Sequence, residues 1–272
     1  MSVAPLPSED TRAGTVGVRR FTVTKNRMLA ELVILLLLIG WWWAAQGLPE
    51  FVLPAPGKVL KLSAKLLFDL STNWGLHTYA SLARVLISTF LALVLGGLVA
   101  LVPTYLKQFD VLVADRVIPF FNAFPSLGWA LLAVLWFGVS DGSVIFVETA
   151  ILLPFCMINM YEGMKSLDTE ILEMAHSFTR ARLRVLRKVV LPMLFPFIFS
   201  SLRVSYGVAW KVSLISELFG ADTGLGYLMN RARQEFDTPL MFATIVAIIV
   251  MVYLVDKFCL ARLETRFARG RI

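Results

Sequence analysis

The chain has few of the residues from which catalytic and metal sites are built. It contains two cysteines and two histidines, and 17% of its residues are charged, against about 25% in a typical soluble protein. The spacing of Cys156 and Cys259 indicates neither a disulfide framework nor a metal site. A phosphate-binding Gly-x-x-x-x-Gly-Lys-Ser/Thr loop is also missing. We therefore expect no catalytic residue, no metal, no cofactor and no ATP hydrolysis in this chain.

Apolar sequence is what the chain has in excess. Hydrophobic residues make up 58% of it and come in long blocks, and a membrane-spanning helix needs about 20 mostly apolar residues. We predict an all-α membrane protein with six transmembrane helices. Prolines inside the third and fifth blocks suit helices within a bundle, where neighbouring helices satisfy the freed backbone groups. The expected spans are 28–46, 79–103, 117–138, 144–161, 190–217 and 240–260.

The distribution of lysine and arginine predicts the orientation. Most of the 26 basic residues lie at the two ends of the chain and in the connections after spans two and four. By the positive-inside rule, both termini are cytoplasmic. The net charge of +7 then reflects topology, and we expect no nucleic-acid partner. The expected segments are a cytoplasmic tail (1–27), a first span with an amphipathic helix against membrane lipid at the outer interface (28–78), a transmembrane core (79–263) and a second tail (264–272).

The cytoplasmic connection at 165–190 is more regular than a positive-inside signal requires. Apolar residues recur at helical spacing from Ile171 to Phe178, and Thr179 is placed to cap a second short helix. We predict two short helices at an angle, basic on one face, that protrude from the cytoplasmic surface.

This connection resembles the loop shared by permeases of bacterial ABC importers, in which Glu-Ala-Ala is followed by Gly and a distal Leu-Pro. Glu173, Ala175, Leu191 and Pro192 match that pattern, and Thr179 stands where glycine is usual. Over 79–263 the chain is similar to the sulfonate/nitrate/taurine branch of that family. The matching motifs include Ser81-Leu-Ala-Arg84, Phe124-Pro125-Ser-Leu-Gly-Trp129, Leu135-Trp136-Phe137-Gly138 and Gly224-Leu-Gly226-Tyr227-Leu228.

The resemblance implies a type I ABC importer permease fold in the bacterial inner membrane and a homodimer of this chain. Two ATPase subunits, which bind ATP and Mg, would dock on the cytoplasmic loops, and a soluble binding protein would deliver the solute outside. Solutes of the branch include sulfonates, taurine, nitrate, bicarbonate, aromatic carboxylates and some vitamin precursors. The residues that couple the ATPase to transport would be Glu173, Ala175, Thr179, Leu191 and Pro192.

The fifth span carries two cations, Arg203 and Lys211. A charge at the centre of a span costs about 2.5–3.5 kcal/mol on insertion scales. On an ideal helix, Gly207 and Trp210 share the face of these cations, and Glu217 returns to it farther along, too far to pair with Arg203. We expect this face to line the translocation pathway and the solute to be anionic or strongly polar.

Two alternatives remain, one for the role of these cations and one for the function. In the first, the cations of span five are structural and bond to backbone carbonyls or to Glu148 of span four. The alternative function is an ion-gradient-driven secondary transporter or a channel, for which internal repeats and intramembrane carboxylates are typical. No repeat is apparent, and Glu148 and Glu162 are the carboxylates in or near span four. Arg84, near the outer end of span two, is expected to extend to the membrane interface.

The connection after span five is the expected outer gate. Gly224 and Gly226 allow tight turns and close backbone approach. We predict that this segment, with Tyr227, caps the pathway and faces the binding protein; the alternative is an ordinary turn.

Overall fold

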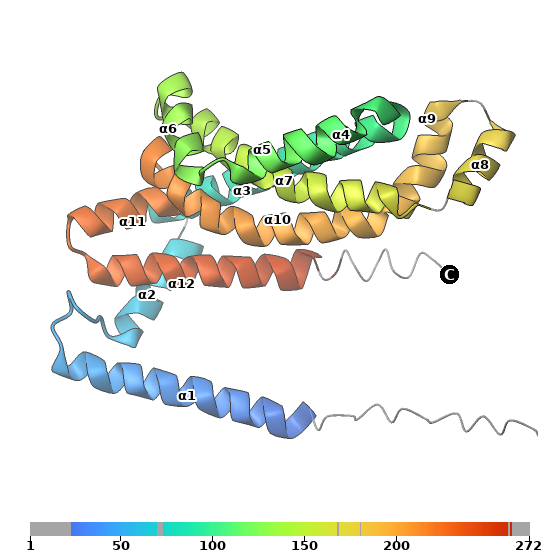
Figure 1. The fold of residues 1–272 in the computed structure, drawn as a ribbon. Helices are drawn as coiled ribbons and strands as arrows, with labels where there is room; N and C mark the ends of the chain where they lie inside the picture. The colour runs from blue at the N-terminus through green and yellow to red at the C-terminus, as the bar shows by residue number, and fades with distance from the viewer. Residues whose placement is uncertain (1–22, 70–72, 168, 180, 261, 263–272) are drawn as a thin grey trace, which may run out of the picture.

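A computed structural model shows a helical molecule and describes residues 23–69, 73–167, 169–179, 181–260 and 262 (Figure 1). None of these residues lies in a strand, so the predicted all-α class is confirmed for them. Most of the two expected tails lies outside the described residues. The α-helices are α1 (Val23–Gly47), α2 (Pro56–Phe68), α3 (Asn73–Tyr105), α4 (Asp110–Leu112), α5 (Ile118–Ala123), α6 (Ser126–Phe137), α7 (Asp141–Lys165), α8 (Thr169–Phe178), α9 (Arg182–Val185), α10 (Leu191–Gly220), α11 (Leu225–Gln234) and α12 (Thr238–Val255), with short 3-10 or π-helices η1 (Lys107–Phe109), η2 (Val113–Val117), η3 (Leu186–Val190) and η4 (Asp256–Leu260).

The long apolar helices account for most of the predicted spans. Within the described residues, four helices are long and apolar enough to cross a membrane, and a bent pair gives a fifth span if it counts as one. The first predicted span corresponds to a shorter apolar helix at Glu31–Gly47. Four or five of the six predicted spans are therefore supported by length and composition. The four are Trp74–Pro103, Asp141–Lys165, Leu183–Gly220 and Thr238–Phe258.

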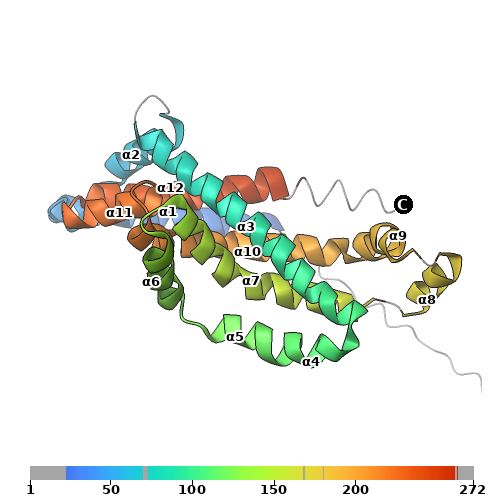
Figure 2. The same ribbon diagram turned by 90° about the horizontal axis from the view of Figure 1, so that it is seen from above.

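The bent pair lies where the sequence predicts a break. Its two halves, Lys107–Ala123 and Ser126–Phe137, meet at 81°. Pro125 causes this bend because its ring disfavours helical angles in the preceding residue, and Phe124 is extended at φ −71° and ψ 126°. The bend turns α6 back across one end of the molecule, where it packs against α7 and α10 (Figures 1 and 2).

The core of the bundle is formed by α3, α7 and α10, which run lengthwise beside one another (Figure 2). Small residues permit close approach: a Cβ added to Gly96 of α3 would lie 2.7 Å from the Cβ of Cys156 on α7. Cys156 is a buried free cysteine, as expected of a packing residue. Helix α2 is the expected amphipathic helix, and its Ser63 hydroxyl donates to the carbonyl of Ala243 in α12 at 3.1 Å.

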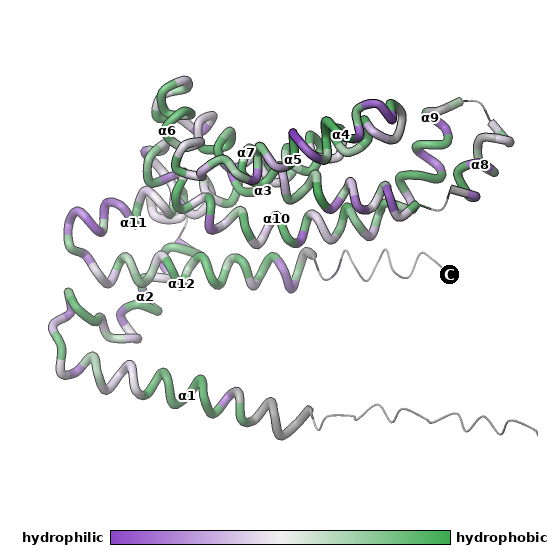
Figure 3. Tube along the Cα trace, viewed as in Figure 1, coloured by the Kyte–Doolittle hydropathy of each residue, from purple (hydrophilic) through white to green (hydrophobic). Residues whose placement is uncertain are grey.

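The two ends of the bundle are polar. The short helices α8 and α9 lie at one end, called the α8 end below, and α6 and α11 lie at the other, called the α11 end (Figure 1). Hydrophilic residues gather in α11 and around α8 and α9, whereas α1 and α12 are hydrophobic along much of their length (Figure 3). This distribution fits a bundle whose middle lies in hydrocarbon and whose ends reach water.

Candidate functional site

The two short helices predicted between spans four and five are present as α8 and α9. The Thr179 hydroxyl accepts a hydrogen bond from the amide of Ala181 at 3.3 Å, just before α9 begins. Threonine therefore fills the turn where the family pattern has glycine. Through η3, α9 continues into α10 as one helical stretch, Leu183–Gly220, in which Leu191 and Pro192 are exposed.

Ala175 does not project from this two-helix unit. It is 9% exposed and packs in a cluster with Val185 and Leu194, on the inner side of the unit. Phe178 and Leu183 are the most exposed large apolar side chains of the unit, at 84% and 75%, and Glu173 is also exposed. The inward turn of Ala175 follows from packing between α8 and η3, which helical spacing alone does not reveal.

The residues predicted to share the pathway face of α10 fall into an exposed group and a buried group. Lys211 and Arg203 are exposed, and Gly207 is half-buried, whereas Trp210 is buried in the core and Glu217 is 1% exposed. The buried pair thus lies off the exposed side of the helix.

Arg203 has a carboxylate partner that the sequence analysis did not identify. Its Nε lies 3.2 Å from Oδ1 of Asp256, which stands in η4 after α12. A carboxylate other than Glu148 thus lies beside Arg203. Glu148 is fully buried and accepts a hydrogen bond from the Ser88 hydroxyl.

Arg84 differs most from its expected position. It is 3% exposed and does not extend to the interface. Its Nη1 lies 2.9 Å from Glu217 and donates to the Thr223 carbonyl at 2.8 Å, and its Nε donates to Asp141 at 2.9 Å. A buried guanidinium persists when its donors meet acceptors; here these are the carboxylates of Asp141 and Glu217 and the carbonyl and hydroxyl of Thr223. We call Ser81, Arg84, Asp141, Glu217 and Thr223 the Arg84 cluster.

The two glycines of the expected outer gate fit closely around Glu217. Gly224 has φ 113°, and a Cβ there would overlap the Glu217 carboxylate. The amide of Gly226 donates to Glu217 at 2.8 Å, and a Cβ on Gly226 would lie 2.7 Å from the carbonyl of Leu214. From Leu225 on, this segment is the first turn of α11 rather than a loop, and Gly224 at its N-cap packs against a buried carboxylate. Tyr227 stacks on His77 of α3 with ring centroids 5.8 Å apart.

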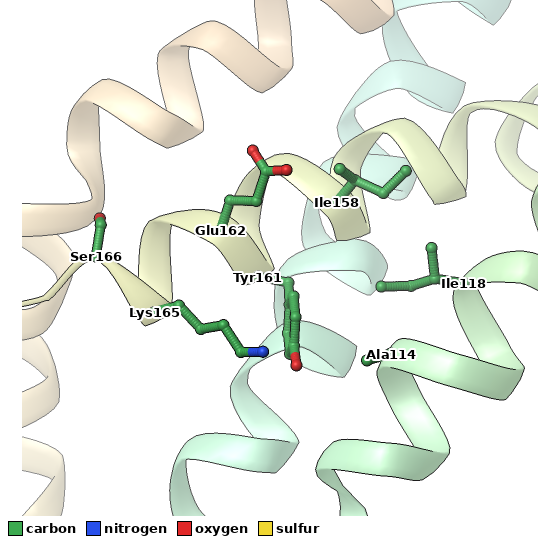
Figure 4. A pocket seen from close by; sticks show the side chains of 7 residues that line it. All are labelled: Ala114, Ile118, Ile158, Tyr161, Glu162, Lys165 and Ser166. Atoms are coloured by element: carbon green, nitrogen blue, oxygen red, sulfur yellow. The ribbon is translucent and has the colours of Figure 1, made fainter.

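A cavity of about 560 Å³ opens between η2, α5 and the α8 end of α7 (Figure 4). Its polar groups already interact: the Lys165 ammonium lies 4.5 Å from the centre of the Tyr161 ring, and the Tyr161 hydroxyl donates to Asp110 at 2.6 Å. We assign no solute to it. Among the described residues, no group of His, Cys, Asp and Glu is arranged to hold a metal ion. The cavity is lined by Ala114, Ile118, Ile158, Tyr161, Glu162, Lys165 and Ser166.

Comparison with known proteins finds relatives that are transport permeases. The taurine transport system permease protein TauC of Escherichia coli (strain K12) is 31% identical over 216 residues, which cover 75% of each chain. The riboflavin transport system permease protein RibX of Chloroflexus aurantiacus is 31% identical over 81% of this chain and 82% of its own. The putative aliphatic sulfonates transport permease protein SsuC of Bacillus subtilis is 28% identical over 76% and 74%.

A solved structure shares the fold. A chain from an inward-facing crystal form of the MetNI methionine ABC transporter superposes with a TM-score of 0.61 and 18% identity, over 70% of this chain and 94% of that one. The family model described as the binding-protein-dependent transport system inner membrane component matches residues 92–268. This match and the relatives show that the chain belongs to that family of ABC transporter permeases, beside its taurine and sulfonate members.

Proposed function

We propose that this chain is the membrane-spanning subunit of an ATP-driven importer for a small anionic solute of the sulfonate or taurine kind. It would sit in the bacterial inner membrane with six spans, counting α1 and the bent pair, and with both termini and the α8 end in the cytoplasm. The observation that carries the proposal is the exposed two-helix unit, α8 and α9, at the end of a continuous helical stretch that reaches the opposite end of the bundle.

The coupling step uses this continuity. An ATP-binding subunit would bind the exposed Phe178 and Leu183, and Glu173 lies beside them on α8. ATP and Mg belong to that subunit. Because η3 joins α9 to α10 without a loop, motion of α9 is transmitted along α10 through Leu191 and Pro192. Two copies of the permease would enclose the pathway, and a solute-binding protein would dock at the α11 end.

The solute class follows from the exposed side of α10. Arg203 and Lys211 place cationic groups there, and a charge at membrane depth is stable where it faces water, a counter-ion or the pathway. Relatives named for taurine and sulfonate transport agree with an anionic solute.

The test is uptake by the complex of permease, ATPase and binding protein in proteoliposomes. We expect Arg203→Gln and Lys211→Gln to lower solute uptake about tenfold and to leave basal ATP turnover intact, because each removes a charge from an exposed side chain on the proposed pathway side of α10. Asp256→Asn is the matched control, since it breaks the ion pair of Arg203 and keeps the cation.

Equal loss of uptake in Arg203→Gln and Asp256→Asn would assign the pair a structural role and remove the argument for an anion. Uptake that follows an ion gradient and needs no ATP would favour the secondary transporter instead.

A further inference from the structure

One face of α3 binds the segment that follows α10. His77, Ser81 and Arg84 are spaced four and three residues apart, so they lie on one side of the helix. Each contacts the connection into α11: His77 Nδ1 accepts from the amide of Gly224 at 3.0 Å, the Ser81 hydroxyl accepts from the amide of Leu225 at 2.8 Å, and Arg84 binds Thr223. This connection is thus attached to α3 as well as to α10.

Glu217 joins the same contacts to α10. It lies three residues before the end of that helix and is bound by Ser81 at 2.7 Å, by Arg84 at 2.9 Å and by the amide of Gly226 at 2.8 Å. Every one of these groups is buried. In a medium of low dielectric constant such charge-assisted hydrogen bonds are strong, and separating them is costly.

The position of Glu217 therefore depends on α10 as a whole. The opposite end of this helix joins η3 and the two-helix unit that the proposed function assigns to the ATPase. A shift of α10 against α3 would draw Glu217 away from Arg84 and Ser81, pull on the amide of Gly226 that it binds, and so strain the contacts between the connection and α3. Helix α11 carries the exposed Arg231 at the surface of the α11 end.

We infer that Arg84 and Glu217 form a latch that holds α11 against α3 and opens when α10 moves, so that ATP-driven motion is expressed at the outer gate. This inference rests on the proposed function for its link to ATP, and on the geometry of the Arg84 cluster for the latch itself.

Amide hydrogen exchange tests the latch without transport. In Arg84→Gln and Glu217→Gln we expect the amides of Gly224, Leu225 and Gly226 to exchange about tenfold faster or more, because their segment loses charge-assisted bonds. Ser88→Ala is the matched control: Ser88 is equally buried on α3 but donates to Glu148 and not to the α11 connection. Unchanged protection in both variants, or an equal rise in Ser88→Ala, would overturn the latch.

Coupling is tested by ATP turnover in the assembled complex. We expect Glu217→Gln to raise turnover without binding protein about tenfold, towards the stimulated rate, because its gate no longer resists motion of α10. If the amides exchange faster but ATP turnover is unchanged, the latch would stand and its link to ATP would be overturned. Absence of ATP-driven uptake in the unmodified complex would contradict the proposed function, and the exchange result would stand apart from it.

If these variants do not fold, a disulfide crosslink tests the same inference. Ser81→Cys with Leu225→Cys, in a chain whose own two cysteines are replaced by serine, joins α3 to the start of α11. We expect the oxidised protein to take up much less solute than the same variant after reduction. Undiminished uptake with the crosslink formed would overturn the inference.

Discussion

At the scale of single residues, Gly224 and Gly138 allow a direct comparison. They are the glycines with positive φ in the described part of the chain, at 113° and 69°. A Cβ added to Gly138 would meet nothing within 4 Å, whereas one added to Gly224 would overlap the carboxylate of Glu217. A substitution that adds a Cβ therefore strains the backbone at both positions, but it creates a steric clash at Gly224 alone.

We predict that Gly224→Ala destabilises the protein more than Gly138→Ala. Strain at positive φ costs about 1–3 kcal/mol for a residue with a Cβ, and displacement of Glu217 from Arg84 adds to it at Gly224. Thermal unfolding in detergent, followed by the fluorescence of the tryptophans, measures the difference. Equal destabilisation by the two variants would show that the Glu217 carboxylate adapts without cost.

At the scale of elements, the two-helix unit of α8 and α9 has one buried side and one exposed side. Its buried side, with Ala175 and Val185, holds the unit against the start of α10. Its exposed side carries Phe178 and Leu183. An exposed aromatic side chain contributes little to folding and much to an interface that buries it.

We predict that Phe178→Asp weakens binding of the ATPase subunit about 30-fold or more and leaves the fold intact, because a buried aromatic anchor is worth about 2 kcal/mol at an interface. Phe236→Asp is the control, since Phe236 is similarly exposed, at 82%, but lies at the α11 end. Copurification and surface plasmon resonance measure the affinity. Undisturbed binding by Phe178→Asp would place the ATPase contact elsewhere on the unit.

At the scale of the whole molecule, the polar ends and the apolar middle imply a defined orientation. Arg184 is exposed on α9 at one end, and Arg233 is exposed on α11 at the other. Positive residues are enriched around α8 and α9, which predicts that this end is cytoplasmic.

We therefore predict opposite labelling of single cysteines in a background without Cys156 and Cys259. Arg233→Cys should react with a membrane-impermeant maleimide on intact cells, or on spheroplasts where an outer membrane is present. Arg184→Cys should react only after the inner membrane is permeabilised. Reaction of both under the first condition would contradict the orientation on which the proposed partners depend.

Features that depend on neighbouring residues in the chain were predictable from the sequence. The long apolar blocks predicted helices because a span must satisfy its backbone internally. Of the breaks predicted at prolines, the one at Pro125 lies between α5 and α6, whereas α10 continues through Pro192 and Pro196 without a break. The spacing around Thr179 predicted the two helices α8 and α9. Each of these follows from local backbone chemistry or from composition, which a single sequence contains.

The tertiary structure alone decided how the charges pair. Arg84 and Glu217 are 133 residues apart, and Arg203 meets Asp256 across 53. A cation inside an apolar block has the same insertion cost whatever it will meet, so the sequence indicates that a partner is needed but does not indicate which one. The packing of α3 against α10 supplies Glu217, and the turn at Gly224 closes around it. Helical spacing likewise placed Ala175 on an apolar face, and only the contact of α8 with η3 showed that this face is buried within the chain.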